Sequence, residues 1–517
     1  MNSTKISAWM VVAMLVAMLS IPAGLAAQDA AAQTNTTKHH HYKFIDLGTF
    51  GGPASYFLNG FDGILNNQGT AVGWADTSMP DPYPAFCFNL DCFVSHAFQW
   101  RKGVVTDLGT LPGGSSSAAN WISANGQIAG YSQNGEIDPN GFPETRAVLW
   151  KDEQAIDLGT LGGNESTAQA VNNRGQVVGA ALNAIPDPFG FGTQVRAFLW
   201  ENGAMQDLGT LGGPDAWAYF VNERGQIAGW SFTNSTPNSA TGIPTQDPFL
   251  WTADDGMTDL GTLGGTLGFP TALNNRGEVV GQSNLAGDLT FHPFVWTKSG
   301  RMQDLGTLGG DTGITNWIND GGDIVGKADL PGLLSPQDHH PVLWTHGVMI
   351  DLGTLPEDSS GNAYYVNSRG QVVGTSEDRQ HMLLGVSQHA VLWENGGPQV
   401  DLNTLIPPGS GLQLTYAVAI NDRGEIAGFG VPPGVPPEDY ETKGHAYILI
   451  PCDDEHADTE GCEDAAQDTT AMTQSNSAPA TPTSMSVAKG SLTPEKLAAF
   501  RARMFSRQRG FGGWPRK

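Results

Sequence analysis

With 517 residues, the chain is long enough for several domains or for one large repeat domain, and its formal net charge of −26 makes it strongly acidic. An acidic body repels nucleic acid, so the composition argues against a nucleic-acid partner. The charge is uneven, because residues 487–517 carry eight Lys and Arg and one acid, a net of +7. The rest of the chain therefore carries −33, the difference between −26 and +7.

The first 27 residues have the pattern of a secretory signal peptide. A single basic residue, Lys5, precedes an apolar run over residues 8–19, a Pro-Ala-Gly break and the small residues Ala26 and Ala27. We expect cleavage near Ala26 or Ala27 and a secreted location, extracellular or periplasmic. An uncleaved membrane anchor is the alternative, but the apolar run is short for a span of about 20 residues. Residues 28–41 are predicted to be a flexible N-terminal segment.

Residues 42–450 are built from a repeated phrase, Asp-Leu-Gly-Thr, with Asn in place of Gly in the last copy. A turn of the form Asn-x-x-Gly follows each copy, with Ser123 in place of Asn in the second, and a short apolar run that usually ends in Trp comes later. Self-similarity at about fifty residues indicates an architecture in which each repeat buries its apolar face on its neighbours. The eight copies begin at Asp46, Asp107, Asp157, Asp207, Asp259, Asp304, Asp351 and Asp401.

Each repeat predicts four extended segments. Asn-x-x-Gly between two apolar runs is typical of a tight hairpin turn, since Asn and Gly accept positive backbone φ. The runs on either side, such as residues 168–171 and 176–180, have the length and composition of strands. No stretch between residues 42 and 450 shows helical periodicity over ten or more residues. We therefore expect an all-β fold of four-stranded antiparallel meanders.

The two ends of the repeat region predict that the repeats close into a circle. The region opens with a fourth strand at 42–47 that has no hairpin partner before it, and it ends with a third strand at 445–450 that has no fourth strand after it. Pairing these two strands would complete the eighth repeat and give an eight-bladed β-propeller. An open stacked array is the alternative, but it gives no reason for complementary ends.

The repeats resemble the HAF family of probable extracellular repeats, named for a His-Ala-Phe triplet. The triplet stands at residues 96–98, with variants at 389–391 and 445–447, and the resemblance spans residues 42–450. It implies a secreted bacterial β-rich repeat protein, and it implies no known activity.

The four cysteines form two local pairs, Cys87 with Cys92 and Cys452 with Cys462. In an oxidising compartment, local disulfides are the natural interpretation. A metal site is the alternative, but the spacing lacks the Cys-x-x-Cys pairs that zinc prefers.

The C-terminal part differs in composition from the repeats. Residues 451–490 are acidic and then rich in Thr, Ser and Pro, which predicts a linker. Residues 491–517 are basic, and Thr493-Pro494-Glu495 with Gly510 predicts a helix between them. This tail could contact an anionic surface or a partner. A solvated tail that docks on its own acidic body is the alternative.

Residues that recur in every repeat are better explained by geometry than by chemistry. The repeated Asp is expected to accept backbone N–H bonds at a strand end. No Gly-x-Ser-x-Gly elbow, phosphate-binding loop or zinc-protease helix is present in the sequence. We therefore expect no catalytic residue, no metal ligand and no cofactor, apart from a structural calcium ion that the sequence does not place. A contact between strands is also expected for the third-strand position, which holds His96, Arg146, Arg196, Asp247, His292, His340, His389 and His445.

Function is expected where the copies differ. Two and three residues before the turn Asn, aromatic and amide side chains replace one another, and they would line the central channel if this strand is innermost. Aromatic faces stack on sugars and amides bind hydroxyls, whereas the alternative is ordinary packing between repeats. The long loops 76–95, 183–195 and 431–444 are a second candidate surface. The candidate ligand-binding residues are Asn120, Trp121, Tyr219, Phe220, Asn316, Trp317, Tyr364 and Tyr365.

Two functions follow from these observations. The first is a secreted, monomeric, non-catalytic repeat protein that binds extracellular carbohydrate or protein or associates with the cell envelope. The alternative is a propeller-type hydrolase acting on extracellular polysaccharide, with acids drawn from unequal loops.

Overall fold

The structure is a computed structural model that describes residues 41–57, 63–138, 141–151, 154–189, 192–239, 241–332, 338–378, 387–394, 397–453, 456 and 462. The chain divides into two units, Met1–Lys38 and His39–Lys517, and every described residue belongs to the second. The predicted signal peptide at 1–27, nearly all of 28–41, most of the linker 451–490 and the tail 491–517 lie outside the described residues. Within the described part, no helix has the length and apolar character needed to cross a membrane.

The described residues form an all-β fold in which each repeat contributes four strands. The first four repeats contain β2 (Gly51–Tyr56), β3 (Thr70–Pro80), β4 (Phe93–Arg101), β5 (Val104–Gly109), β6 (Ser117–Ile122), β7 (Ile128–Ile137), β8 (Pro143–Lys151), β9 (Gln154–Asp157), β10 (Gly162–Val171), β11 (Val177–Pro186), β12 (Thr193–Glu201), β13 (Ala204–Asp207), β14 (Ala216–Val221), β15 (Ile227–Phe232), β16 (Gln246–Thr252) and β17 (Gly256–Asp259).

The later repeats follow the same order. They contain β18 (Gly264–Leu273), β19 (Val279–Leu285), β20 (Phe291–Thr297), β21 (Arg301–Asp304), β22 (Gly313–Ile318), β23 (Ile324–Asp329), β24 (His339–Thr345), β25 (Val348–Asp351), β26 (Ser360–Val366), β27 (Val372–Glu377), β28 (Gln388–Trp393), β29 (Val400–Asp401), β30 (Gln413–Ile420), β31 (Ile426–Val431), β32 (His445–Pro451) and β1 (Tyr42–Asp46).

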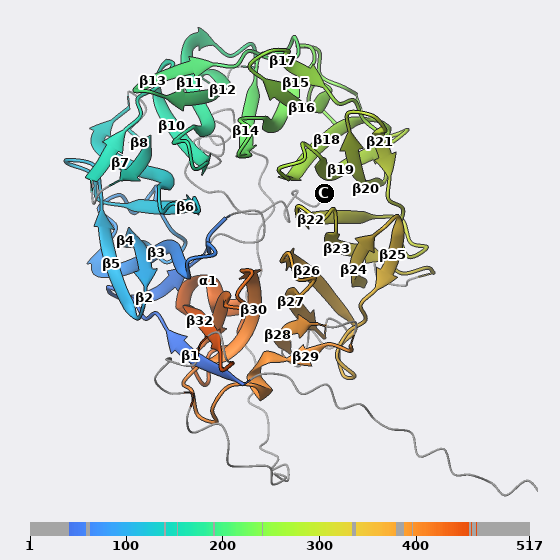
Figure 1. The fold of residues 1–517 in the computed structure, drawn as a ribbon. Helices are drawn as coiled ribbons and strands as arrows, with labels where there is room; N and C mark the ends of the chain where they lie inside the picture. The colour runs from blue at the N-terminus through green and yellow to red at the C-terminus, as the bar shows by residue number, and fades with distance from the viewer. Residues whose placement is uncertain are drawn as a thin grey trace, which may run out of the picture. The chain divides into compact units, whose positions relative to one another are not determined.

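Consecutive strands within each repeat pair antiparallel, as the turn pattern predicted. Six sheets among the described residues have four strands each, and the fourth and fifth repeats share an eight-stranded sheet. The link between those two repeats is a single parallel bridge from Gln246 to Leu267. Figure 1 shows the first strands of the repeats, such as β6, β14 and β22, nearest the middle, and fourth strands such as β13 and β25 on the outside. Four-stranded antiparallel sheets arranged in this way are the architecture of a β-propeller.

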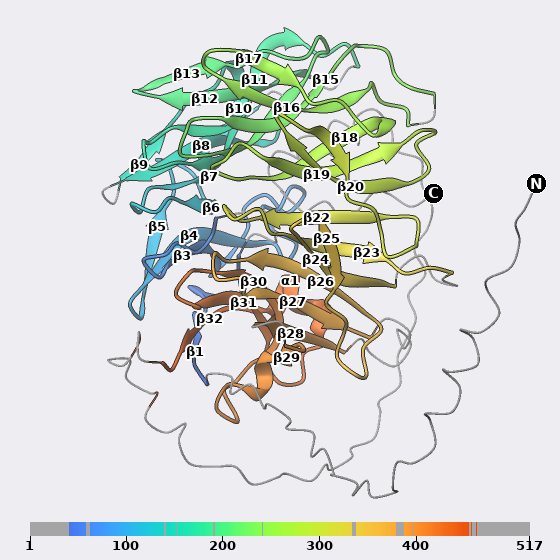
Figure 2. The same cartoon turned by 45° about the vertical axis from the view of Figure 1, so that its right-hand side comes forward.

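The predicted pairing of the two ends of the repeat region is confirmed. Strand β1 pairs antiparallel with β32, in a register that runs from Tyr42 opposite Pro451 to Asp46 opposite Tyr447. The pairing is extended beyond the strands, because the Cys452 N–H donates to the main-chain oxygen of His41 at 2.8 Å. Figure 2 shows β1 beside β32 from a second direction. The eighth repeat is thus completed by the first strand of the chain.

A glycine in the middle of each second strand lets the sheet pack closely. In the fifth repeat, a Cβ on Gly281 would lie 2.0 Å from the main-chain oxygen of Phe269 and 2.7 Å from the ring of Phe294. The Phe294 side chain is fully buried and belongs to the third strand. A larger residue at position 281 would therefore displace both the first strand and the aromatic side chain of the third. This packing explains the second glycine of the repeated turn pattern.

A short helix covers the junction of the last and first repeats. Helix α1 (Tyr440–Lys443) follows the 3-10 turn η2 (Pro437–Asp439) in the loop after β31, and a second 3-10 turn, η1 (Leu402–Thr404), follows β29. Just after α1, the main-chain oxygen of Gly444 accepts the N–H of Ser55 in β2 at 3.0 Å. The loop of the last repeat is therefore held against the first repeat.

Candidate ligand-binding site

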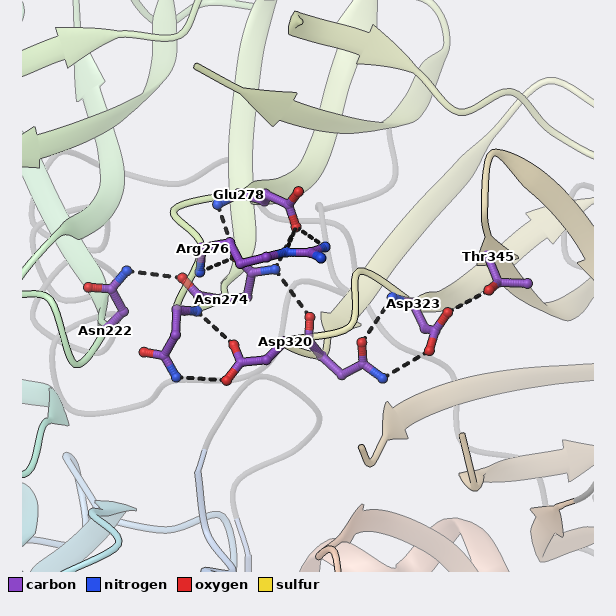
Figure 3. A network of polar contacts seen from close by, with 9 residues as sticks. Asn222, Asn274, Arg276, Glu278, Asp320, Asp323 and Thr345 are labelled. Atoms are coloured by element: carbon purple, nitrogen blue, oxygen red, sulfur yellow. Dashed lines mark hydrogen bonds and ion pairs between the residues drawn. The ribbon is translucent and has the colours of Figure 1, made fainter. Parts of the chain in front are cut away.

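The Asn-x-x-Gly turns are joined to one another by side-chain hydrogen bonds (Figure 3). The Oδ1 atom of Asn274 accepts the N–H groups of Arg276 and Glu278, each at 3.0 Å, and so fixes its own turn. Its Nδ2 donates to the main-chain oxygen of Asn319 in the next repeat at 3.1 Å. Six other turn asparagines likewise donate Nδ2 to a main-chain oxygen in the turn of the next repeat. They are Asn66, Asn172, Asn222, Asn319, Asn367 and Asn421.

The second repeat lacks the turn Asn, and a neighbouring residue makes the contact instead. Ser123 stands at that position, and Asn125 two residues later donates its Nδ2 to the main-chain oxygen of Asn173 at 2.8 Å. In return, the N–H of Asn125 donates to Oδ1 of Asn173 at 2.9 Å. Each of the eight turns therefore bonds to the next, and the last, at Asn421, bonds back to Asn66.

The glycine of the turn is required for two reasons. Gly69 has a φ of +72°, a conformation that residues with a Cβ rarely adopt. A Cβ at this position would also lie 2.7 Å from Oε2 of Glu425, which belongs to the preceding turn of the circle. The first and last turns are therefore in packing contact as well as hydrogen-bonded to each other.

The repeated Asp has the geometric role that the sequence predicted. In the first copy, Oδ1 of Asp46 accepts the N–H of Gly48 at 2.8 Å. All eight copies accept the N–H of the residue two positions later, at distances between 2.7 and 2.9 Å. A carboxylate engaged in the same backbone turn in every repeat is a structural element.

In five repeats the third-strand side chain contacts this Asp across the strands, whereas Arg146 pairs with Glu144 and His389 with Asp358. Nδ1 of His96 lies 2.8 Å from Oδ2 of Asp107, and Nε of Arg196 lies 3.0 Å from Oδ2 of Asp207. Burial raises the pKa of Asp107, but hydrogen bonds from His96 and from a backbone N–H more than offset it and hold that pKa below its usual value. The same contact joins His292 to Asp304, His340 to Asp351 and His445 to Asp46.

Asp247 breaks this pattern in the fourth repeat. It stands where the other repeats have His or Arg, so two carboxyl groups, Asp247 and Asp259, hydrogen-bond each other. Burial, followed by the charge of Asp259, raises the pKa of Asp247 to about 7. A proton shared by the two groups is the physical consequence. The sequence signal was present, because Asp247 is the one acid at this position, but the exception was not singled out.

Four of the eight predicted ligand-binding residues meet in the middle of the molecule. The ring centroid of Trp121 lies 6.3 Å from that of Trp317 and 6.4 Å from that of Phe220. Trp317 also stacks on Tyr365 at 4.4 Å with an angle of 22°. These residues come from β6, β14, β22 and β26, the first strands of four different repeats. Phe220 is buried, whereas Trp121, Trp317 and Tyr365 are partly exposed. We call these four residues the aromatic cluster.

The two predicted amides are engaged with the neighbouring repeat. Nδ2 of Asn120 donates to the main-chain oxygen of Ala168 at 2.9 Å, and Nδ2 of Asn316 donates to that of Ala363 at 2.7 Å. Both side chains are buried, at 0% and 1% exposure respectively. Their donor groups therefore hold adjacent first strands together.

The remaining two predicted residues lie beside other aromatic side chains. Tyr219 stacks on Trp217 at 5.9 Å, and its hydroxyl accepts the Nε1–H of Trp230 at 3.1 Å. The ring of Tyr364 lies 6.1 Å from that of Tyr416. Both tyrosines are partly exposed, and the ring of Tyr219 also lies 6.1 Å from that of Phe220.

Polar atoms on the inner strands β6 and β10 lack hydrogen-bond partners among the described residues. They are Oδ1 of Asn120, Oγ1 of Thr167 and Nε2 of Gln169, all buried. A buried polar atom without a partner costs about 1–3 kcal/mol, so such groups favour a polar guest. The Asn120 acceptor is next to Trp121 in sequence, whereas Thr167 and Gln169 belong to the first strand of the following repeat.

A second polar cluster, which the sequence analysis missed, surrounds Asp76 in the first repeat. Oδ1 of Asp76 accepts the Ser95 hydroxyl at 2.6 Å, and Oδ2 accepts the backbone N–H of Ala54 at 3.1 Å. Asp76 also hydrogen-bonds Asp91, whose Oδ2 accepts the Tyr56 hydroxyl at 2.8 Å. Burial, assisted by Asp91, raises the pKa of Asp76 to about 8. The sequence signal was an acid two residues after Trp74, at the start of the range 76–95 and still within β3.

The cysteines pair as predicted. Disulfides join Cys87 to Cys92 in the loop that carries Asp91, and Cys452 to Cys462 beyond β32. Across the residues that the structure describes, no three His, Cys, Asp or Glu side chains gather as a metal site requires. A structural calcium ion stays a prediction. A cavity of about 210 Å³ lies elsewhere, lined by Tyr42, Arg369, Arg423 and Asp453 among others, and none of the predicted ligand residues lines it.

No protein-family model matches the sequence, and no curated protein matches it. Several solved structures are similar in fold. The β-propeller domain of the Trilobed protease from Pyrococcus furiosus is 8% identical, with a TM-score of 0.38, over 71% of this chain and 98% of that one. Oligogalacturonate lyase from Vibrio parahaemolyticus is 9% identical, with a TM-score of 0.36, over 81% and 100%. Dipeptidyl peptidase 4 from Porphyromonas gingivalis is 10% identical, with a TM-score of 0.38, over 66% and 54%. Similarity at this level does not extend to an activity.

Proposed function

We propose that this chain is a secreted, non-catalytic β-propeller of eight blades, related to the HAF repeats, that binds an extracellular carbohydrate at its aromatic cluster. The proposal of eight blades is supported by two circular features, the turn-to-turn hydrogen bonds that return from Asn421 to Asn66 and the pairing of β1 with β32. Secretion is supported by the two disulfides, which persist in oxidising compartments, and by the signal-peptide pattern of residues 1–27.

The observation that carries the proposal is the convergence of partly exposed aromatic side chains on the inner strands. Trp121, Trp317 and Tyr365 come from three repeats, and the ring of Trp317 contacts the rings of the other two. Aromatic side chains with neighbouring unsatisfied polar atoms suit a sugar, whose apolar face stacks on a ring and whose hydroxyls both donate and accept hydrogen bonds. Oδ1 of Asn120, next to Trp121 in sequence, is a buried acceptor without a partner among the described residues.

The test combines a glycan array with calorimetry on the full chain. We expect a glycan hit whose binding is lost in Trp121→Ala and in Trp317→Ala, without turnover of the glycan. Trp200→Ala is the matched control, because Trp200 is also a partly exposed tryptophan but belongs to a third strand. Urea unfolding of all three variants separates loss of binding from loss of fold. Glycan affinity equal to that of the wild type in folded Trp121→Ala and Trp317→Ala would contradict the proposal.

A second candidate function is a hydrolase acting on extracellular polysaccharide, and the Asp76 cluster is the observation that favours it. A carboxyl group with a pKa of about 8 is protonated at neutral pH, as a general acid must be. Against this function, the Asp76 oxygens are engaged by Ser95, Ala54 and Asp91. Two hydrogen-bonded carboxyls are closer than the roughly 5–5.5 Å that a retaining glycosidase places across a scissile bond.

A polysaccharide hydrolysis screen with the wild-type chain and Asp91→Asn separates the two functions. Turnover that disappears in Asp91→Asn while glycan binding is kept would establish the hydrolase. No turnover with retained binding supports the binding protein.

A further inference from the structure

The second strands of the first three repeats are longer than those of the other repeats. Strands β3, β7 and β11 have 11, 10 and 10 residues, whereas β15, β19, β23, β27 and β31 have six or seven. The extra three to five residues extend each strand by about 10–15 Å at the end opposite the Asn-x-x-Gly turn. Three consecutive repeats therefore project on the loop side of the molecule.

Large apolar side chains are exposed on these projections. Met79, Ile137 and Ile185 lie within the last two residues of β3, β7 and β11 and are 56%, 45% and 55% exposed. Leu90 is exposed in the loop after β3. We call these four residues the tip row. The first two projections are joined, because the rings of Phe86 and Phe142 lie 4.2 Å apart. Exposed apolar groups at the corresponding ends of strands in three consecutive repeats suit a surface that a partner segment covers.

The accessible charge around the tip row is acidic. The three connections, residues 76–95, 133–145 and 183–195, contain seven Asp and Glu and no Lys or Arg, but Asp76, Asp81, Glu144 and Asp187 are buried. Arg146 and Arg196, which directly follow two of these connections, are paired with Glu144 and Asp207. Glu136 is exposed, and Asp91 and Asp138 are partly exposed. The surface therefore suits an occupant that combines apolar and basic side chains.

The C-terminal tail of this chain has that combination. Residues 487–517 carry a net charge of +7, and their apolar residues, Leu497, Phe500, Met504 and Phe505, are interspersed with arginines. About 31 residues separate Cys462, the last described residue, from Thr493. A linker of that length has an r.m.s. end-to-end distance of about 30 Å, comparable to the size of the domain. The tethered tail is thus present at an effective concentration on the order of millimolar.

We propose that the basic tail, residues 493–510, docks on the tip row of its own chain. Its apolar side chains cover Met79, Ile137 and Ile185, and its arginines lie against the surrounding carboxylates. This docking is independent of the ligand at the aromatic cluster, because the tip row lies at the opposite end of the strands from the turn next to Trp121.

The first test is zero-length carbodiimide cross-linking of the full chain, read by peptide mass spectrometry. We expect an intramolecular link from Lys496 to Glu136, Asp138 or Asp91, with a yield independent of protein concentration. The double variant Ile137→Thr and Ile185→Thr should lower that yield about tenfold, because two apolar contacts are lost. Val348→Thr is the matched control, since Val348 is 59% exposed in β25, outside the three projections, and this variant should leave the yield unchanged.

The second test measures trypsin cleavage after Arg501, Arg503 and Arg507. In the full chain, cleavage should be at least about tenfold slower than in a synthetic peptide of residues 487–517, and the double variant should restore the faster rate. Cleavage at the peptide rate in the wild-type chain, or equal effects of Val348→Thr and the double variant, would overturn the proposal. So would binding of the full chain to phosphatidylglycerol vesicles as tightly as the peptide, since the tail would then be free for an anionic membrane.

Discussion

Asn421 donates its side-chain amide to the main-chain oxygen of Asn66 at 3.0 Å, across 355 residues of sequence. This bond joins the last turn of the repeat region to the first. The pairing of β1 with β32 makes a second connection between the same two ends. The two ends of the repeat region are therefore joined twice, by a side-chain hydrogen bond at the inner strands and by backbone pairing of β1 with β32 at the outer strands.

Removing the turn amide should destabilise the whole domain. In Asn421→Ala, the bond to Asn66 is lost, and the N–H groups of Arg423 and Glu425 lose the Oδ1 acceptor at 3.0 Å. Because this site is buried, we expect a loss of about 2–4 kcal/mol in the free energy of unfolding, measured by urea denaturation. Ser368→Ala is the control, since the structure gives Ser368 a bond to Asp422 only through its backbone N–H. Equal midpoints for the two variants would contradict this account.

Removing strand β1 should be far more costly than removing the segment before it. A chain that begins at residue 48 leaves β32 as an unpaired strand edge, and we expect its Tm to fall by roughly 10 °C or more, with aggregation. A chain that begins at residue 39 keeps β1 and the whole second unit, so its Tm should be unchanged. Differential scanning calorimetry of the two truncations decides the matter. A cooperative transition at the wild-type Tm without β1 would show that the strand does not hold the ends together.

The carboxyl pair in the fourth repeat should make stability depend on pH. In the unfolded chain, Asp247 titrates near the ordinary pKa of about 3.9, whereas its pKa in the folded chain is about 7. Between these values the folded state binds more protons, so stability falls as the pH rises from about 4 to about 7. Asp247→Asn should be more stable than the wild type at pH 7.5, and this advantage should shrink at pH 5.

Urea midpoints at the two pH values measure that effect. Asp255→Asn is the control, because Asp255 is an exposed acid near the same hairpin, and it should change the midpoint little at either pH. The same advantage for Asp247→Asn at pH 5 and pH 7.5 would show that the carboxyl pair does not share a proton.

The disulfide in the first repeat should stabilise the loop that carries Asp91. Replacing Cys87 and Cys92 by Ser opens a loop with a sequence separation of five, for which the expected loss is about 2 kcal/mol. Unfolding of the double variant by urea measures the loss, and peptide mapping of the unreduced wild-type chain checks both pairings. A Cys87–Cys462 peptide would contradict the local pairing of both disulfides.

The fold was largely predictable because the same turn and strand motifs occur in eight copies of the repeat. Turn geometry, strand lengths and the pairing of 42–47 with 445–450 each depend on local residue types that recur, and the structure places them as expected. The role of the repeated Asp was also predictable, since a backbone contact two residues away is set by local geometry.

The candidate sites were harder to predict because they depend on contacts between different repeats. Sequence identifies Asn120 and Trp121 as variable positions, but only the packing shows that the Asn120 donor is taken up by Ala168 while Trp121 meets Trp317. The Asp76 cluster was missed because its partner Asp91 lies in an irregular loop whose path no periodicity fixes. A residue that departs from the repeat pattern, such as Asp247, therefore indicates a candidate site better than the residues that recur in every repeat.

The two ends of the strands differ in how much their connections vary between repeats. The interlocked turns are nearly uniform from repeat to repeat, whereas the connections between second and third strands differ in length and composition. New segments can therefore be inserted on the loop side without disturbing the bonds that hold the circle. This separation makes the protein a natural scaffold for peptide grafting, in which several inserted loops would be displayed side by side at fixed angular spacing on one rigid support.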